Sequence, residues 1–159
     1  GKQPALFQLM EKTGVDFVNT VQDNDSINIL NYRNFYNGGG VAIGDLNNDG
    51  LPDIFFTANQ GSNKLYLNKG DFKFEDISAK AGFVNKKQFS TGVVMVDVNH
   101  DGWLDIYVCN AGNMHDPELR KNQLFINNHT SPSTPKGGEG RGEVVYIATG
   151  IPLIPGCGS

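Results

Sequence analysis

Residues 45–53 have the sequence DLNNDGLPD and residues 97–105 have the sequence DVNHDGWLD, so both follow the pattern D-x-N-x-D-G-x-x-D. Similarity at a fixed spacing of about 50 residues is the signature of a repeat architecture. Two acidic loops of one pattern therefore indicate that the chain is built from a repeated unit. The apolar runs that flank the loops also match each other. The run 40–44 before the first loop matches 92–96 before the second, and the run 54–56 after the first loop matches 106–108 after the second.

The match between the two units continues downstream of the loops. Residues 63–68 (NKLYLN) match residues 122–127 (NQLFIN), and we expect the extra residues 110–121 to be a surface insertion. The unit therefore has four recognisable parts. The last part, a Phe-led run followed by a glycine, occurs at 7–11 with 14–15 and at 74–78 with 82–83.

The apolar runs predict strands. They are short, rich in Val, Ile, Phe and Tyr, and bounded by Gly, Asn and Asp, which is typical of β-structure. Residues 5–13 are the best candidate for a helix, but their match to 74–78 favours a strand edge and a turn. A unit of about 50 residues with three or four antiparallel strands has the size of a propeller blade. We therefore predict an all-β chain of antiparallel β-propeller blades, a partial propeller with two full repeats and part of a third.

The two loops carry the chemistry of a calcium site. Ca²⁺ takes six to eight oxygen ligands, which alternate residues of a tight loop can supply. Three carboxylates this close in sequence repel one another unless a cation lies between them. We therefore predict two Ca²⁺ sites. Their expected ligands are Asp45, Asn47, Asp49, the Leu51 carbonyl and Asp53 in the first loop, and Asp97, Asn99, Asp101, the Trp103 carbonyl and Asp105 in the second.

Acidic loops of this pattern also occur in two other settings. An EF-hand begins with the same residues but needs a bidentate carboxylate at position 12. That position is Phe56 in the first loop and Val108 in the second, and both lie in strand-like runs. The EF-hand is therefore excluded. Asx-rich turns without metal stay an alternative, because turns favour Asp, Asn and Gly in any case.

The charge of the chain is acidic and modest. Its 159 residues carry a formal net charge of −4 with a pI near 5.2, and six of the 12 Asp residues lie in the two loops. Nucleic-acid binding depends on clustered Lys and Arg, so we expect no nucleic-acid partner. The apolar runs are far shorter than the roughly 20 residues of a membrane helix, so we expect no membrane span.

No set of residues outside the loops suggests catalysis. The sequence holds neither a Gly-rich phosphate loop nor a G-x-S-x-G motif. Paired carboxylates serve in glycosidases, but a bound cation lowers the pKa of its carboxylate ligands and makes them poor general acids. We therefore predict no catalytic residues. The alternative is a fragment of a calcium-dependent propeller enzyme, a lyase or glycosidase that acts on polysaccharide.

The repeat also resembles a known family. With h for an apolar residue, the pattern is G-V-x-h-x-D-x-N-x-D-G-x-x-D-h-h-h, then N-x-L-[YF]-h-N and F-E-D-I. It resembles the FG-GAP/VCBS repeats of integrin-α-type propellers, above all the branch of the cartilage acidic proteins and their bacterial relatives. The resemblance covers about residues 7–128 and implies Ca²⁺ at the ten positions named above. It also implies a secreted, periplasmic or cell-surface protein that binds an extracellular protein or glycan ligand in adhesion or recognition.

The repeat does not extend to the end of the sequence. Residues 1–128 form the predicted repeat region, and residues 129–159 form a Gly/Pro-rich tail with one expected strand at 143–148 and a truncated or unnatural end. The literal F-G…G-A-P signature is missing, which argues against an integrin-like ligand surface. A closed propeller needs at least four blades. We therefore expect the partner of these blades to be the rest of a propeller or a second copy of the chain.

Overall fold

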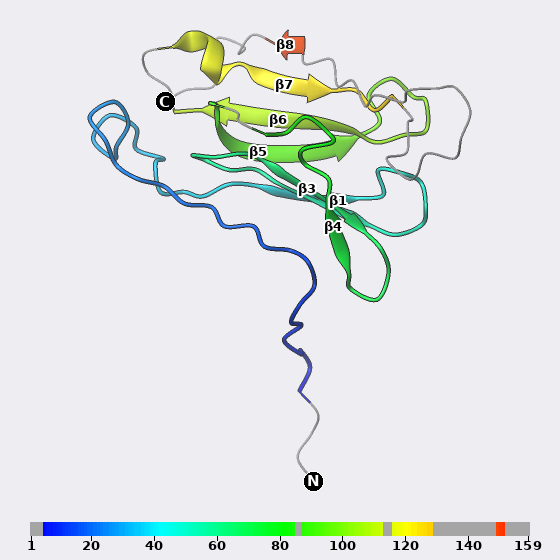
Figure 1. The fold of residues 1–159 in the computed structure, drawn as a ribbon. Coiled ribbons are helices and arrows are strands. Elements are labelled where there is room, and N and C mark those ends of the chain that lie inside the picture. The colour runs from blue at the N-terminus through cyan, green and yellow to red at the C-terminus, as the bar shows by residue number, and fades with distance from the viewer. Residues whose placement is uncertain (1–4, 85–86, 113–115, 129–148, 152–159) are drawn as a thin grey trace.

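The computed structural model describes residues 5–84, 87–112, 116–128 and the backbone of 149–151. The first sheet is an antiparallel meander in which each strand pairs with the next (Figure 1). The first acidic loop connects its first two strands, as predicted. The strands of this sheet are β1 (Val41–Gly44), β2 (Asp53–Phe56), β3 (Lys64–Asn68) and β4 (Phe74–Asp76).

The second sheet has the same order and the same antiparallel pairing. The second acidic loop connects its first two strands, which confirms the repeat. The insertion before β7 contains the 3-10 helix η1 (Pro117–Arg120), the one helical element in the described ranges. The strands are β5 (Phe89–Val96), β6 (Asp105–Ala111), β7 (Asn122–Phe125) and β8 (Thr149–Ile151).

The all-β prediction is therefore confirmed, and the described residues form two sheets that do not close into a ring. The strand expected at 143–148 lies outside the described residues. The fourth strand of the second sheet is β8, which starts at Thr149 and pairs with β7. Within the described part of the chain, no helix has the length and apolar character needed to cross a membrane.

The expectation of a strand edge at residues 7–11 is wrong. These residues are in neither strand nor helix, and Figure 1 shows them in an arm that projects away from both sheets. The side chains of Leu6, Phe7 and Leu9 are exposed. A strand needs a neighbouring strand for its backbone hydrogen bonds, and the arm at this point has none among the described residues.

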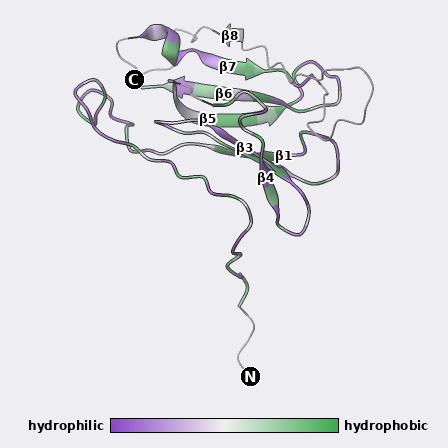
Figure 2. Cartoon of the chain, in the orientation of Figure 1, coloured by the Kyte–Doolittle hydropathy of each residue, from purple (hydrophilic) through white to green (hydrophobic). Residues whose placement is uncertain are grey.

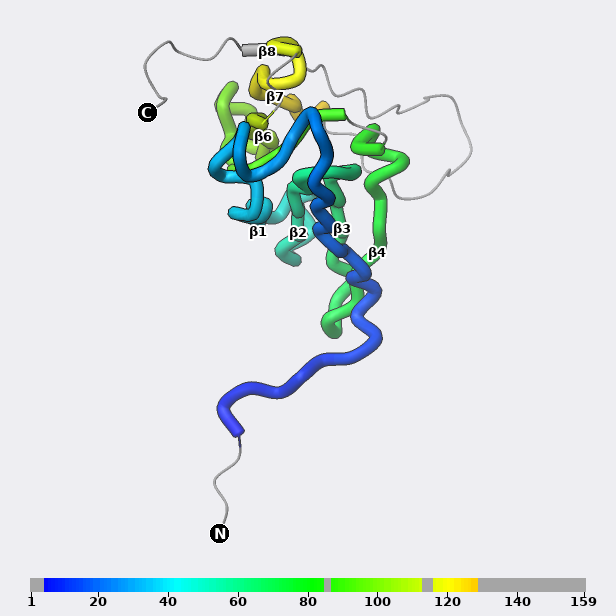
Figure 3. The backbone as a smooth tube through the Cα atoms, turned by 90° about the vertical axis from the view of Figure 1, so that its left-hand side faces the viewer, coloured from blue at the N-terminus to red at the C-terminus, as the bar shows by residue number. Residues whose placement is uncertain are grey.

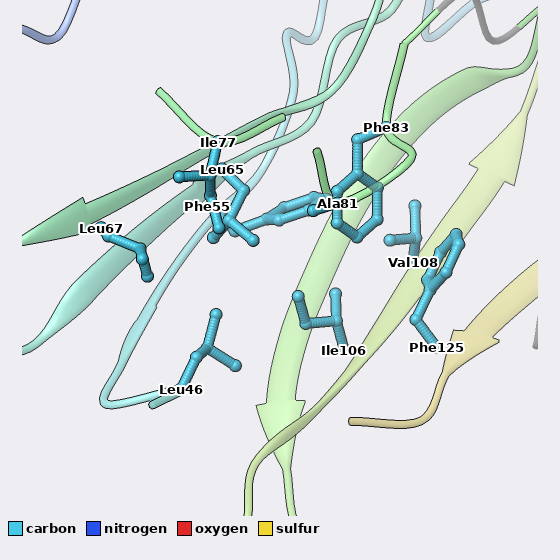
Figure 4. Close-up of a cluster of buried hydrophobic side chains, with 10 residues drawn as sticks. All are labelled: Leu46, Phe55, Leu65, Leu67, Ile77, Ala81, Phe83, Ile106, Val108 and Phe125. Carbon is cyan, nitrogen blue, oxygen red and sulfur yellow. The ribbon is translucent and has the colours of Figure 1, made fainter. Parts of the chain in front are cut away.

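The two sheets pack on each other through one face each. Side chains alternate between the faces of a strand, so Phe55, Leu65 and Leu67 share the inner face of the first sheet. Ile106, Val108 and Phe125 approach them from the second sheet, as Figure 4 shows. In Figure 2, β5 is mostly white to green, which is the hydrophobic end of the scale.

The segment between the sheets fills the remaining space of the core. Ile77 and Ala81 are buried there. Phe83 is fully buried, with ring centroids 4.8 Å from Phe55 and 4.9 Å from Phe125. This segment therefore joins the two inner faces into one hydrophobic core.

Strands β1 and β5, the first strands of the two sheets, approach each other closely. An ideal Cβ placed on Gly40 would lie 2.9 Å from the Gly92 Cα, and one placed on Gly44 would lie 2.7 Å from the Leu104 Cδ1. The backbone of Gly92 leaves no room for a side chain at Gly40, and a side chain at Gly44 would require Leu104 to shift. Gly40 and Gly44, at the two ends of the run 40–44, therefore permit the sheets to pack at short distance.

Candidate metal-binding loops

The first loop, residues 45–53, is closed by hydrogen bonds from its backbone to its own side chains. The Asp45 carboxylate accepts from the Asp49 N–H at 3.1 Å and from the Gly50 N–H at 2.8 Å. Asn47 Oδ1 also accepts from the Asp49 N–H, at 3.2 Å. Asn48 and Gly50 have φ values of 54° and 85°, which only Gly, Asn and Asp adopt readily.

The second loop, residues 97–105, repeats this geometry. Asp97 accepts from the Asp101 N–H at 3.2 Å and from the Gly102 N–H at 2.9 Å. His100 and Gly102 take φ values of 61° and 86°, which nearly equal those of the first loop. Two separate stretches of sequence thus fold into one conformation, as the shared pattern predicts.

The last aspartate of each loop is buried. Asp53 is fully buried, and its two oxygens accept from the Leu46 N–H and the Asn68 N–H, both at 2.9 Å. Asp105 is equally buried and accepts from the N–H groups of Val98 at 3.1 Å and Asn127 at 2.8 Å. Each of these carboxylates therefore joins its loop to the run N-x-L-[YF]-h-N of its own repeat, 63–68 in the first and 122–127 in the second.

The electrostatics of the loops favour the approach of a cation. Burial, together with repulsion by Asp49 and Asp45, raises the pKa of Asp53 to about 6, against the lowering effect of its two N–H donors. The Gly102 N–H holds the pKa of the exposed Asp97 below its usual range. A buried carboxylate with acidic neighbours gains from a positive charge nearby, because the charge offsets both burial and repulsion.

The predicted ligands are near one another in each loop, but they do not converge on one point. The Asp49 carboxylate accepts from Asn47 Nδ2 at 2.9 Å and from the Leu51 N–H at 2.8 Å. Asp101 makes the same bonds with Asn99, at 2.7 Å, and with Trp103, at 2.9 Å. Across the described residues, no three acidic, His or Cys side chains form a group that could hold a metal.

The donor chemistry of the loops nevertheless fits Ca²⁺. Each loop offers three carboxylates, one amide oxygen and backbone carbonyls, which are the hard oxygen ligands that Ca²⁺ prefers. A carboxylate oxygen that accepts one N–H retains capacity for a further contact. The ten predicted residues therefore supply the right atoms, while their present orientation is set by the hydrogen bonds within the loop.

Sequence reasoning missed the residues that brace the two loops. Asn127 donates through Nδ2 to the carbonyl of Leu46 at 2.8 Å and to that of Leu104 at 3.2 Å, so it connects both loops. Asn48 Nδ2 donates to the Gly102 carbonyl at 3.1 Å, which places the loops side by side. The repeated Asn of N-x-L-[YF]-h-N was a usable signal for Asn127, but nothing in the sequence pairs Asn48 with Gly102.

Parts of this chain are similar in sequence to known proteins. Cartilage acidic protein 1 of Xenopus tropicalis is 39% identical over 90 residues, which cover 56% of this chain and 14% of the relative. The protein of the same name from Homo sapiens is 38% identical over 81 residues, 50% of this chain and 12% of the relative. Integrin alpha-PS5 of Drosophila melanogaster is 34% identical over 83 residues, 46% of this chain and 8% of the relative.

The matched part of the chain thus spans only a small fraction of each of these relatives. A family model described as FG-GAP-like repeat matches residues 45–108. That range starts at the first aspartate of the first loop and includes the whole second loop. The segment that carries both acidic loops is therefore similar to the FG-GAP-like repeat.

Proposed function

We propose that this chain is a calcium-binding, non-enzymatic repeat module of an extracellular protein that serves in adhesion or recognition. The observation that carries the proposal is the pair of loops with one hydrogen-bond pattern and one set of oxygen donors. Each loop concentrates three aspartates in nine residues. Such a density of negative charge is stabilised when a divalent cation neutralises it.

The relatives support the adhesion part of the proposal. Matches to cartilage acidic protein 1 and to integrin alpha chains, together with the FG-GAP-like repeat, favour a secreted, periplasmic or cell-surface location. The partner would be an extracellular protein or glycan. Calcium modules of that environment bind with dissociation constants of about 10⁻⁴–10⁻³ M, so extracellular calcium would keep the loops occupied. No observation in the described residues favours a polysaccharide lyase or glycosidase.

Thermal unfolding in calcium, magnesium and chelator tests the metal assignment. At 10 mM Ca²⁺, a site with a dissociation constant of about 10⁻⁴–10⁻³ M adds about 1.4–2.7 kcal/mol to the unfolding free energy. We expect the melting temperature to rise with calcium and to rise less in Asp49→Ala and in Asp101→Ala. A double variant should show no rise.

Asp71→Asn is the matched control. Asp71 is exposed outside both loops and has a φ of 50°, a conformation that Asn tolerates. This variant should keep the full calcium response. A melting temperature that calcium leaves unchanged in the wild-type chain would contradict the metal assignment. An equal shift in all variants would contradict the choice of residues.

A further inference from the structure

The segment that leads into β1 contains the pair Asn37-Gly38, the one Asn-Gly pair in the sequence. Figure 3 shows this segment, in blue to light blue, on the side of the molecule that faces the viewer. An asparagine followed by glycine is the pair in which the next backbone nitrogen most readily attacks the side-chain amide, because glycine has no Cβ to hinder the approach. The chemistry of spontaneous deamidation therefore points to Asn37.

The contacts of Asn37 leave its side-chain carbonyl open. The residue is exposed. Its amide Nδ2 donates to Asn34 Oδ1 at 3.1 Å, and its backbone N–H donates to the Asn34 carbonyl at 3.2 Å. The Oδ1 atom of Asn37, in contrast, accepts no hydrogen bond from the residues that the structure describes. These contacts therefore do not cover the carbonyl group that is attacked in deamidation.

The backbone nitrogen of Gly38 is the other reacting group. Its N–H donates to no acceptor among the described residues, while the Gly38 carbonyl accepts from Asn59 Nδ2 at 3.0 Å. An ideal Cβ on Gly38 would have no atom within 4 Å, so the space around this residue is open. Within the described part of the chain, no hydrogen bond of its own holds this nitrogen away from the side chain of Asn37, and a cyclic imide has room to form.

The glycines of the two acidic loops show what protects such a pair. Each follows an aspartate, so a similar ring closure has to be considered there. The Gly50 N–H, however, donates to the Asp45 carboxylate at 2.8 Å, and the Gly102 N–H donates to that of Asp97 at 2.9 Å. Hydrogen bonds to an ionised carboxylate are strong and keep these nitrogens in place. An ionised aspartate is also attacked less readily than an amide, so the reaction is favoured at Asn37.

We propose that Asn37 is a site of spontaneous deamidation in the folded chain. The Gly38 nitrogen attacks Cγ of Asn37 and forms a new C–N bond, the bond from Cγ to Nδ2 breaks, and the proton lost by Gly38 leaves with Nδ2 as ammonia. Water then opens the cyclic imide. Hydrolysis at Cγ gives aspartate, and hydrolysis at the backbone carbonyl carbon of Asn37 gives isoaspartate, in which the main chain runs through Cβ and Cγ. The proposal does not depend on calcium binding.

The two products differ in what they do to the start of β1. The Gly40 N–H donates to Thr57 Oγ1 at 2.6 Å, and the Gly40 carbonyl accepts from the Thr57 N–H at 2.9 Å. An ideal Cβ on Gly39 would lie 2.1 Å from the Thr57 carbonyl oxygen, so the chain has no room to shift there. Isoaspartate lengthens the main chain just before this contact and therefore strains it, whereas aspartate leaves the backbone unchanged.

Peptide mass spectrometry of the full chain, incubated in the folded state at mildly alkaline pH, tests the proposal. We expect residue 37 to exchange its amide NH₂ for OH, at a rate that increases with pH because the attacking nitrogen reacts after it loses its proton. Asn34 is the internal control, since it is also exposed but is followed by Phe35, and it should stay an amide. Asn37→Gln should lose the modification, because the longer side chain places its carbonyl carbon farther from the Gly38 nitrogen.

A parallel incubation in guanidinium chloride separates the effect of the fold from that of the sequence. An Asn37 that reacts in the unfolded chain but stays intact in the folded chain would overturn the proposal, and so would modification of Asn34 at the same rate. Denaturant unfolding of the separated products then tests the strain at β1. The isoaspartate form should unfold at a lower denaturant concentration than Asn37→Asp, which carries the same charge on an unchanged backbone. Equal midpoints would contradict that strain.

Discussion

At the scale of the residue, the backbone conformation of the first loop requires glycine at position 50, whereas the space around it would accommodate a side chain. Gly50 has a φ of 85°, and an ideal Cβ on it would have no atom within 4 Å. Gly50→Ala should therefore lower the unfolding free energy by about 1 kcal/mol through backbone strain alone. Denaturant unfolding in chelator measures this effect without a contribution from metal.

Gly92→Ala is the control for that substitution. Its Cβ would meet the Cys109 side chain at an ordinary contact distance of 3.7 Å, and its φ is not in the left-handed region. We expect a change within about 0.5 kcal/mol, as at most undemanding positions. Equal losses in both variants would show that the conformation of the loop is not what Gly50 provides.

The buried aspartate of the first loop predicts a pH dependence. In chelator, folded Asp53 holds its proton up to about pH 6, while an unfolded aspartate releases it near pH 4. The folded state binds the extra proton in this window, so the contribution of Asp53 to stability falls as the pH rises from about 4 to 6. The unfolding free energy of the wild type, relative to that of Asp53→Asn, should therefore increase as the pH is lowered.

Urea unfolding of both proteins at several pH values between 4 and 7 measures that difference. Asp71→Asn again serves as the control, because it replaces an exposed carboxylate by the same amide. A wild-type advantage over Asp53→Asn that stays constant from pH 4 to 6 would contradict the raised pKa.

At the scale of the element, the segment between the sheets depends on one aromatic side chain. Phe83 is fully buried and contacts Phe55 in the first sheet and Phe125 in the second. Phe83→Ala should lower the unfolding free energy by about 3–5 kcal/mol, the usual cost of such a cavity. Phe72→Ala, at a position 66% exposed, should cost far less in the same denaturant experiment.

The strands and loops could be predicted because their signals are local. Short β-branched and aromatic runs between Asp, Asn and Gly give the strands around both loops, and β1 and β2 fall where the flanking runs predict them. The segment at 7–11 could not be predicted in this way. Its sequence resembles that of β4. A strand also needs another strand beside it to accept its backbone hydrogen bonds, and the sequence of the segment alone does not determine whether one lies there.

At the scale of the whole molecule, the sequence predicts two similar units but not how they contact each other. The buried Asn59 shows the difficulty. Its side chain donates to the carbonyls of Gly38 and Ser90, both at 3.0 Å, and so connects segments on both sides of it in sequence. No motif signals such a bond, because the partners are backbone atoms of residues with no pattern in common.

The relative placement of the sheets also brings the two acidic loops into contact. Asn48 of the first loop donates to the Gly102 carbonyl of the second loop at 3.1 Å. If the loops bind calcium as proposed, a cation that reoriented one loop would act on a hydrogen bond held by the other, and this would couple the two sites by a free energy. We expect the effects of Asp49→Ala and Asp101→Ala on calcium-dependent stability to be non-additive, as is usual for residues in one network.

Asn48→Gly removes one of the two side chains that connect the loops, leaves Asn127 in place, and permits the φ of 54° at this position. Calcium titration calorimetry and melting curves on the single and double aspartate variants should then give effects closer to additive in the Asn48→Gly background. His100→Gly is the matched control, because His100 occupies the equivalent position with a φ of 61°, and the non-additivity should survive there. Additive effects in the wild-type background would show that the two loops bind calcium independently despite their contact.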